Sequence, residues 1–138
     1  PLLHDKFGFL GGTLVTGIIW TAWHVPLILF SNYNNGTPPL FALTCFFVMI
    51  VNTSVIMTWL RLRSGSVWPC AILHGSHNLF IQAIFTPLTS ERGGITAYAI
   101  DEFGFMLPAA GAVVALIFWI FRDRAIAAYE ERRAQGLT

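Results

Sequence analysis

The sequence predicts an all-α protein, a polytopic membrane helix bundle with about four transmembrane helices. Three observations carry this prediction: the low share of charged residues, four apolar runs of near-spanning length, and an uneven distribution of positive charge. Hydrophobic residues make up 55% of the chain and charged residues 11%, and the mean hydropathy is +0.64. A soluble domain carries about 25% charged residues. The composition therefore favours a lipid bilayer, and the absence of a basic cluster argues against a nucleic-acid partner.

The four apolar runs approach the roughly 20 residues that a spanning helix needs. They cover about residues 8–30, 40–60, 67–85 and 103–121. Turn-forming residues fill the connection between the first two runs, and a longer polar connection separates the last two. We expect residues 1–121 to form a transmembrane core that is the C-terminal part of a larger membrane protein. Residues 122–138 are expected to form a charged cytoplasmic tail.

Each run has its own features. Threonines that can bond to the backbone of their own helix interrupt the first run. The second is the most apolar, and the simplest role for its Asn52 is a hydrogen bond to another helix. The third starts with Trp68, which suits a membrane interface, and Pro69, which a first helical turn accepts. The fourth is rich in alanine and glycine, which allow close helix contact.

Positive charge gives the expected orientation. With four crossings, all but one of the lysines and arginines fall on one side of the membrane, and only Arg92 falls on the other. Cytoplasmic loops carry the excess of lysine and arginine. We therefore expect an integral protein of a bacterial plasma membrane, with the first residues and the C-terminus in the cytoplasm. Cys45 and Cys70 both lie in apolar runs and are expected as free thiols.

Polar side chains in the first and third runs mark a candidate site. His74 and Asn78 are four residues apart and share a helix face, and His24 lies among apolar and aromatic residues of the first run. Ionisable side chains inside a membrane usually face the bundle interior or a wet cavity. We therefore expect His24, His74 and Asn78 to meet in one site. His77 is expected at its edge, because it points roughly 60° away from His74.

The chemistry of these groups suits hydrolysis. An imidazole accepts or donates a proton near neutral pH, and an amide N–H stabilises negative charge that develops on a carbonyl oxygen. Activation of water needs a further base or a metal, and metal sets usually include a carboxylate. All seven acidic residues fall in the expected loops or tail, so no carboxylate is expected beside the histidines. They are Asp5, Glu91, Asp101, Glu102, Asp123, Glu130 and Glu131.

Two motifs carry a family resemblance. Trp20 followed by His24 and Pro26 resembles the second motif of the CAAX protease and bacteriocin-processing family of intramembrane proteases. The segment Arg-Ser-Gly-Ser-Val-Trp-Pro, which leads to His74 and Asn78, resembles the third motif and its lead-in. The likeness extends over about residues 1–110. The family's first motif, a glutamate pair followed by an arginine, is absent from the sequence and is expected upstream of it.

The resemblance implies an intramembrane endopeptidase of the CAAX prenyl protease type. Such an enzyme cleaves a peptide bond at the membrane through a water that glutamate and histidine activate. His24 and His74 would position or activate this water, or bind a divalent metal such as zinc, and Asn78 would donate to the oxyanion. The expected partners are the bilayer and a membrane-embedded or membrane-associated peptide or protein. Without the glutamate pair, this chain alone is expected to be inactive.

Two alternatives from other functional classes stay open. His24 and His74 would suit the axial positions of a haem in a membrane electron carrier, which needs no carboxylate. The polar groups would otherwise only bridge helices in a non-catalytic membrane scaffold or immunity protein. A shared, polar cavity favours the protease over the scaffold.

Overall fold

A computed structural model describes residues 1–137, and over these residues the chain is helical with no strand. The elements are α1 (Leu2–Phe30), α2 (Pro39–Ser64), α3 (Trp68–His77), the π-helix η1 (Asn78–Phe85), α4 (Thr86–Leu88), α5 (Thr96–Ala99), α6 (Met106–Ile120) and α7 (Arg122–Ala134). The all-α prediction is confirmed. Thr138, the last residue of the expected tail, lies outside the described residues.

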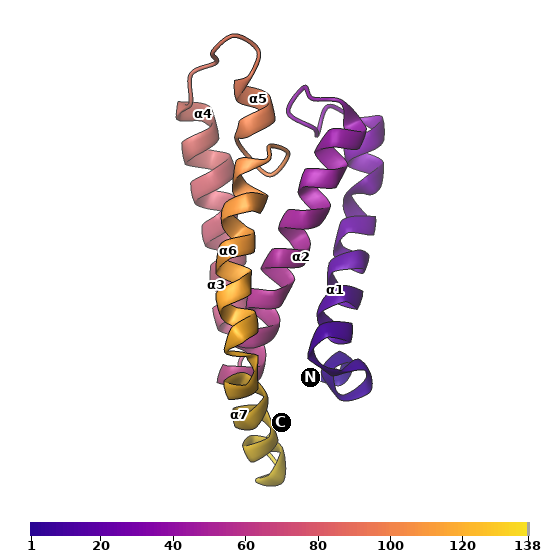
Figure 1. Cartoon of the computed structure of the whole chain (residues 1–138), viewed down its shortest axis with the longest axis vertical. Helices are drawn as coiled ribbons and strands as arrows, with labels where there is room; N and C mark the ends of the chain where they lie inside the picture. Colours follow the sequence, from indigo (N-terminus) through magenta and orange to yellow (C-terminus); the bar gives the residue numbers. More distant parts are fainter. Residues whose placement is uncertain (138) are drawn as a thin grey trace.

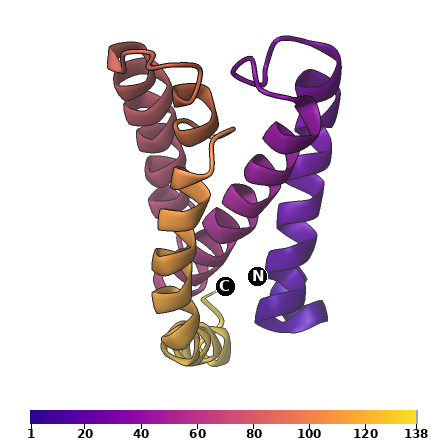
Figure 2. The ribbon, with the colours of Figure 1, turned by 45° about the horizontal axis from the view of Figure 1, so that its top comes forward.

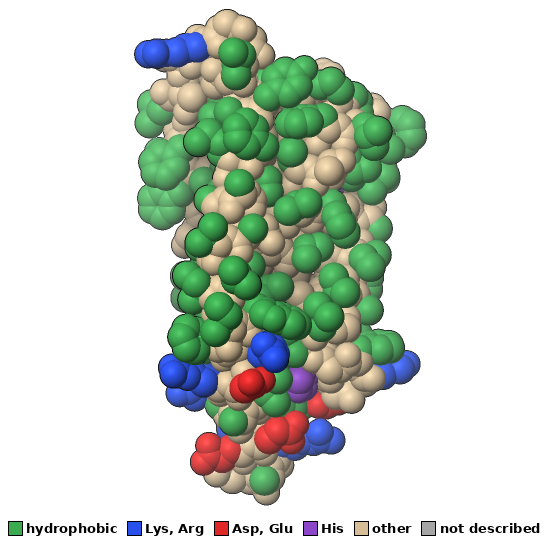
Figure 3. Space-filling view, in the orientation of Figure 1, with side chains coloured by type: hydrophobic (Ala, Val, Ile, Leu, Met, Phe, Trp, Pro, Cys, Tyr) green, Lys and Arg blue, Asp and Glu red, His purple; other side chains and the backbone are tan. Residues whose placement is uncertain are grey.

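The long helices run up and down along one axis (Figure 1). Both chain ends lie at one end of the bundle, which we call the terminal end. The opposite end, the loop end, carries the connection between α1 and α2 and the segment around α5. Charged side chains gather at the terminal end, and apolar side chains cover most of the length between the two ends (Figure 3). This distribution fits an integral membrane protein.

The number of spans differs from the expected count. α1 and α2 are each long and apolar enough to cross a membrane, and the pair α6 and α7, bent by 52°, passes the same test as one unit. By length and composition, the described residues therefore hold two or three candidate spans. The third expected crossing is divided among α3, η1 and α4, which follow one another without a gap.

Helix α2 is the centre of the bundle, because it packs against α1, α3, α6 and α7. It runs obliquely between α1 on one side and the pair of α3 and α6 on the other (Figure 2). The Asn52 side chain on α2 donates a hydrogen bond of 2.9 Å to the Pro108 carbonyl on α6. The predicted interhelical role of Asn52 is thus confirmed. Cys45 and Cys70 are free thiols, as expected.

The contact between α1 and α2 combines a polar pair with a close approach. The Thr13 hydroxyl donates to the Thr58 hydroxyl across 3.1 Å. One turn further along α1, an added Cβ at Gly17 would lie 3.3 Å from the Val51 side chain, so the absence of a side chain lets the two helices approach closely. Gly8, with φ of 69°, interrupts α1 and turns its first residues aside.

Two clusters of buried apolar residues pack the helices together, one toward each end of the bundle. The cluster toward the loop end supports the candidate site, and the cluster toward the terminal end joins α7 to α1 and α2. The first contains Ile28, Ala42, Phe46, Met49, Ile50 and Phe103, and the second contains Phe9, Leu62, Ala125 and Tyr129. α7 therefore forms most of the expected charged tail, and its inner face is packed against the bundle.

Candidate active site

A cavity of about 130 Å³ lies between α1, α2 and the helix that starts with α3. His24, His74, His77 and Asn78 all line it, so the structure brings the sequence-predicted residues to one place. Its other walls are aromatic, apolar and polar side chains from α1, α2, η1 and the loops. They are Trp20, Tyr33, Phe46, Met49, Ile50, Thr53, Gln82 and Glu102.

Trp20 contacts both expected catalytic histidines. Its indole lies nearly parallel to the His74 imidazole, with 5.1 Å between ring centroids and 13° between ring planes. Its carbonyl oxygen lies 3.0 Å from Nδ1 of His24, one turn further along α1. A helical turn rises about 5.4 Å. Trp20 and His24, one turn apart on α1, thus both line the cavity together with His74.

The hydrogen bond of His24 defines which nitrogen is free. A carbonyl oxygen only accepts, so Nδ1–H of His24 donates to Trp20. In the neutral imidazole Nε2 then carries no hydrogen and can accept one from water. The ring is held by Phe46, at a centroid distance of 4.8 Å, and by Tyr33, at 6.4 Å. His24 is therefore both a fixed packing residue and a proton acceptor at the cavity.

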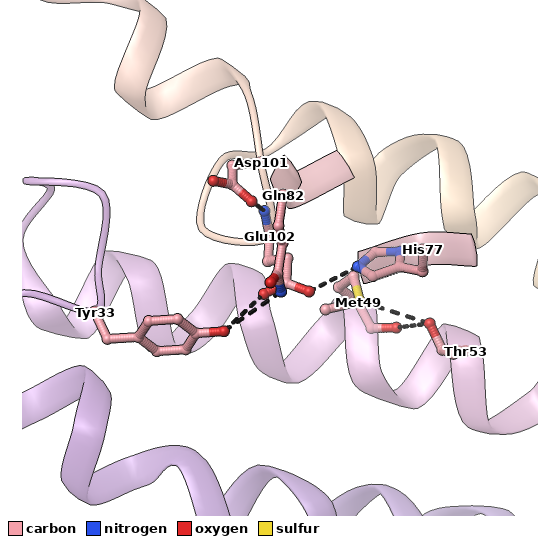
Figure 4. Close-up of polar contacts among 7 residues, drawn as sticks. All are labelled: Tyr33, Met49, Thr53, His77, Gln82, Asp101 and Glu102. Atoms are coloured by element: carbon pink, nitrogen blue, oxygen red, sulfur yellow. Dashed lines mark hydrogen bonds and ion pairs between the residues drawn. The ribbon is translucent and has the colours of Figure 1, made fainter. Parts of the chain in front are cut away.

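One expectation is wrong: a carboxylate does lie beside the histidines. Glu102 is only 4% exposed, and its Oε1 is 2.7 Å from Nε2 of His77 (Figure 4). The connection that contains Glu102 does not stay in solvent but folds back toward the bundle after α5. Asp101, with φ of 67°, makes the turn, and its carboxylate accepts the Glu102 backbone N–H at 2.7 Å. The sequence places Glu102 in a polar connection, and only the path of the loop reveals its burial.

Tyr33 and Gln82 complete the polar contacts of Glu102, and neither was expected. The Tyr33 hydroxyl donates to Oε2 of Glu102 at 3.2 Å, and the Gln82 amide donates to the Tyr33 oxygen at 3.5 Å (Figure 4). Tyr33 belongs to the loop after α1, whose turn-forming composition hides its role. A signal for Gln82 existed, because it is the one polar residue within the apolar segment 79–85.

The charges of this group follow from its surroundings. Burial alone would raise the pKa of Glu102, but the hydrogen bonds with His77, Gln82 and Tyr33 outweigh it and hold the pKa below its usual value. Burial first, and then the negative charge of Glu102, raise the pKa of Tyr33 to about 12. At neutral pH Glu102 is therefore ionised, and the Tyr33 hydroxyl keeps the hydrogen that it donates.

The π-helix places Gln82 on this side of its helix. His77 and Gln82 are five residues apart, and in an α-helix they would point roughly 140° away from each other. A π-helix bonds residues five apart, so such residues lie nearly above one another. η1 begins at Asn78, directly after His77, and the change of register turns Gln82 toward the cavity.

A metal site does not form from these residues alone. Zinc in catalytic sites usually takes three protein ligands. Among residues 1–137, no group of three histidine, cysteine, aspartate or glutamate side chains is placed to hold a metal ion. His24 and His74 offer two imidazoles, and the nearby carboxylate of Glu102 is engaged by His77 and Tyr33. Metal binding by His24 and His74 would thus need a further ligand.

The comparison with protein families agrees with the two motifs. A family model described as type II CAAX prenyl endopeptidase Rce1-like matches residues 1–80, which include His24, His74 and Asn78. Comparisons with curated proteins and with solved structures give no match. The family match covers more than half of the chain, and so the chain belongs to the type II CAAX prenyl endopeptidase Rce1-like family.

Proposed function

We propose that this chain forms the histidine and asparagine part of the active site of an intramembrane endopeptidase of the CAAX prenyl protease type. One observation carries the proposal: His24, His74 and Asn78, from two separate helices, line a single cavity. Family membership gives this cavity its chemical interpretation. The substrate is a peptide or protein that is embedded in or associated with the membrane.

The contacts suggest a role for each residue. Nε2 of His24 is free to accept a hydrogen bond from the attacking water, because Nδ1–H is engaged by Trp20. His74 lies under the Trp20 indole, which holds its ring at the cavity wall. The Asn78 amide supplies an N–H to the developing oxyanion. The carboxylate that activates water belongs to the family's glutamate motif, and Glu102 does not replace it because its two oxygens bind His77 and Tyr33.

Of the alternatives, the haem protein receives no support from the size of the cavity. A volume of about 130 Å³ is less than half of the roughly 300 Å³ at the lower end of small-molecule pockets. A scaffold in which the histidines only bridge helices would not need a shared cavity. The protease therefore accounts for more of the observed geometry than either alternative.

The test compares variants of the full-length parent protein, reconstituted in vesicles, on a membrane-anchored peptide. His24→Ala, His74→Ala and Asn78→Ala should each lower turnover by about 10²–10⁴-fold, the range for general acid–base and oxyanion groups. His4→Ala is the matched control, because His4 packs against Tyr129 at the terminal end, away from the cavity. It should leave turnover nearly unchanged at equal protein abundance.

Residues 1–138 alone should insert into membranes and fold but should not cleave the peptide. Full activity of the parent that carries both His24→Ala and His74→Ala would remove the proposed mechanism. Cleavage by residues 1–138 alone would show that the upstream glutamates are not required.

A further inference from the structure

The cavity holds a second polar pair that the proposed roles do not use. Nε2 of His77 lies 2.7 Å from Oε1 of Glu102, and the two side chains are 21% and 5% exposed. His77 ends α3, and Glu102 lies 25 residues later in the loop before α6. Burial of an ionised carboxylate is unfavourable unless partners compensate it. The burial of Glu102 therefore depends on well-placed partners.

Several segments contribute to holding Glu102 in place. Tyr33 from the loop after α1 donates to its second carboxylate oxygen, and Gln82 from η1 donates to Tyr33. The Asp101 side chain accepts the backbone N–H of Glu102. Both oxygens of Glu102 and its backbone are thus fixed, and a buried network with satisfied partners is rigid.

The charge of Glu102 determines the hydrogen position on His77. An ionised carboxylate can only accept hydrogen bonds, so the hydrogen between the two residues belongs to Nε2 of His77. In the neutral imidazole the other nitrogen, Nδ1, then carries none. Within residues 1–137, Glu102 is the one hydrogen-bond partner found for the His77 ring. The His77 side chain lines the cavity, and Nδ1 has no hydrogen-bond partner among the described residues.

We propose that Glu102 is a positioning residue that fixes His77 in the tautomer with hydrogen on Nε2, so that Nδ1 of His77 holds a water in the cavity. The tautomer follows from the contact with the ionised Glu102 carboxylate, and the use of that water in peptide cleavage rests on the proposed function. His77 therefore has a direct role at the cavity. From the sequence alone it is expected only at the edge of the site, because its side chain points away from that of His74.

The charged and titratable groups around His77 support this assignment. Glu102 and Asp101 approach it from the loop before α6, and Tyr33 from the loop after α1. His24 and His74 line the same cavity. Among the described residues, no lysine or arginine lines the cavity. Nothing on these elements therefore competes with His77 for the carboxylate of Glu102 except the neutral donors Tyr33 and Gln82.

The first measurement is the tautomer of His77, from ¹⁵N chemical shifts of histidine-labelled full-length protein in micelles at a pH where the imidazole is neutral. The unmodified protein should show hydrogen on Nε2 and a bare Nδ1. Glu102→Gln should lose this preference. Glu91→Gln is the matched control, because it makes the same change at an exposed carboxylate in the connection between α4 and α5 that does not line the cavity.

The second measurement is peptide cleavage by the same proteins. Glu102→Gln should lower kcat by about 10–100-fold, the usual effect of losing a group that orients a histidine, with little change in KM. Glu102→Asp should recover part of the loss, and Glu91→Gln should retain activity.

The outcomes separate the two proposals. Hydrogen on Nδ1 of His77 in the unmodified protein overturns the inference even if Glu102→Gln does not fold. Unchanged kcat in Glu102→Gln, under conditions where His24→Ala is inactive, also overturns it. A tautomer that follows Glu102 in a parent protein that cleaves nothing supports the fixed tautomer and contradicts the protease.

Discussion

The indole of Trp20 lies flat against the imidazole of His74, at 5.1 Å between centroids and 13° between planes. This contact joins the two helices that carry the family motifs. Trp20→Ala removes the stack but keeps the backbone carbonyl that binds His24. Aromatic stacks contribute about 0.5–1.5 kcal/mol, so we expect kcat of the full-length protein to fall between roughly two- and tenfold through a less ordered His74.

The control for this variant is Trp23→Ala. Trp23 lies on the same helix but is 79% exposed, so its loss should affect membrane anchoring and leave kcat unchanged. Equal losses in the two variants would show that the stack on His74 has no specific effect on turnover.

The Glu102 network predicts a pH dependence of stability. The pKa of Glu102 is below its ordinary value of 4.5 in the folded protein, so the unfolded state binds more protons in this range. The stabilisation from Glu102 is therefore complete above pH 4.5 and disappears as the pH falls through the lower, folded pKa. Near neutral pH, Glu102→Gln should lower the unfolding free energy by about 1.5–3 kcal/mol, and the difference should shrink below pH 4.5 in thermal unfolding in micelles.

Asp101 is expected to change stability with pH in the opposite direction to Glu102. Burial raises its pKa above the ordinary value of 3.8, so its ionisation lowers stability as the pH rises from 3.8 to the folded pKa, and the full loss remains above that pKa. Asp101→Asn should therefore raise stability at neutral pH relative to acidic pH. A parallel pH trend for Glu102→Gln and Asp101→Asn would contradict the assigned charges.

Asn52 is predicted to contribute to stability without a role in cleavage. Its side chain joins α2 to the Pro108 carbonyl on α6. Interhelical hydrogen bonds in membranes contribute about 0.6 kcal/mol on average and up to about 1.7. Asn52→Ala should lower the unfolding free energy within this range, with kcat unchanged for the folded fraction. The control is Thr44→Ala, which removes an exposed hydroxyl that is hydrogen-bonded within α2 and should change neither the unfolding free energy nor kcat. A large loss of kcat in Asn52→Ala would instead place Asn52 in the active site.

The orientation in the membrane is tested by cysteine labelling in a protein that lacks Cys45 and Cys70. The positive charges gather with the chain ends (Figure 3), so the loop end should face the outside. Asn34→Cys and Thr96→Cys lie in or beside its exposed connections, and both should react with an impermeant reagent on intact cells. Protection of both, with labelling only after lysis, would reverse the orientation.

The sequence predicted the parts of the site that depend on one helix at a time. His24, His74 and Asn78 are polar groups in apolar runs, and the cost of exposing such groups to lipid directs them inward. The same reasoning identified Asn52. Glu102 was not predictable in this way, because its burial depends on a loop that folds back and on a partner 25 residues away. The direction of the Gln82 side chain was not predictable for another reason. A count of 3.6 residues per turn does not apply in the π-helix η1.

The π-helix after His77 has a consequence for how the two walls of the cavity can vary. Upstream of Asn78, the facing of each side chain is set by the packing of α3 on α2. Downstream, the π-helical geometry of η1 determines the directions of the Gln82 side chain and of the residues that lead to α4. Removal of one residue within 79–81 would restore α-helical spacing and turn the downstream wall by roughly 100°, while His74 and Asn78 stay in place. The change from α-helix to π-helix at Asn78 therefore separates the two parts of the cavity wall. The side chains of the loop-end wall can change direction while His74 and Asn78 keep theirs.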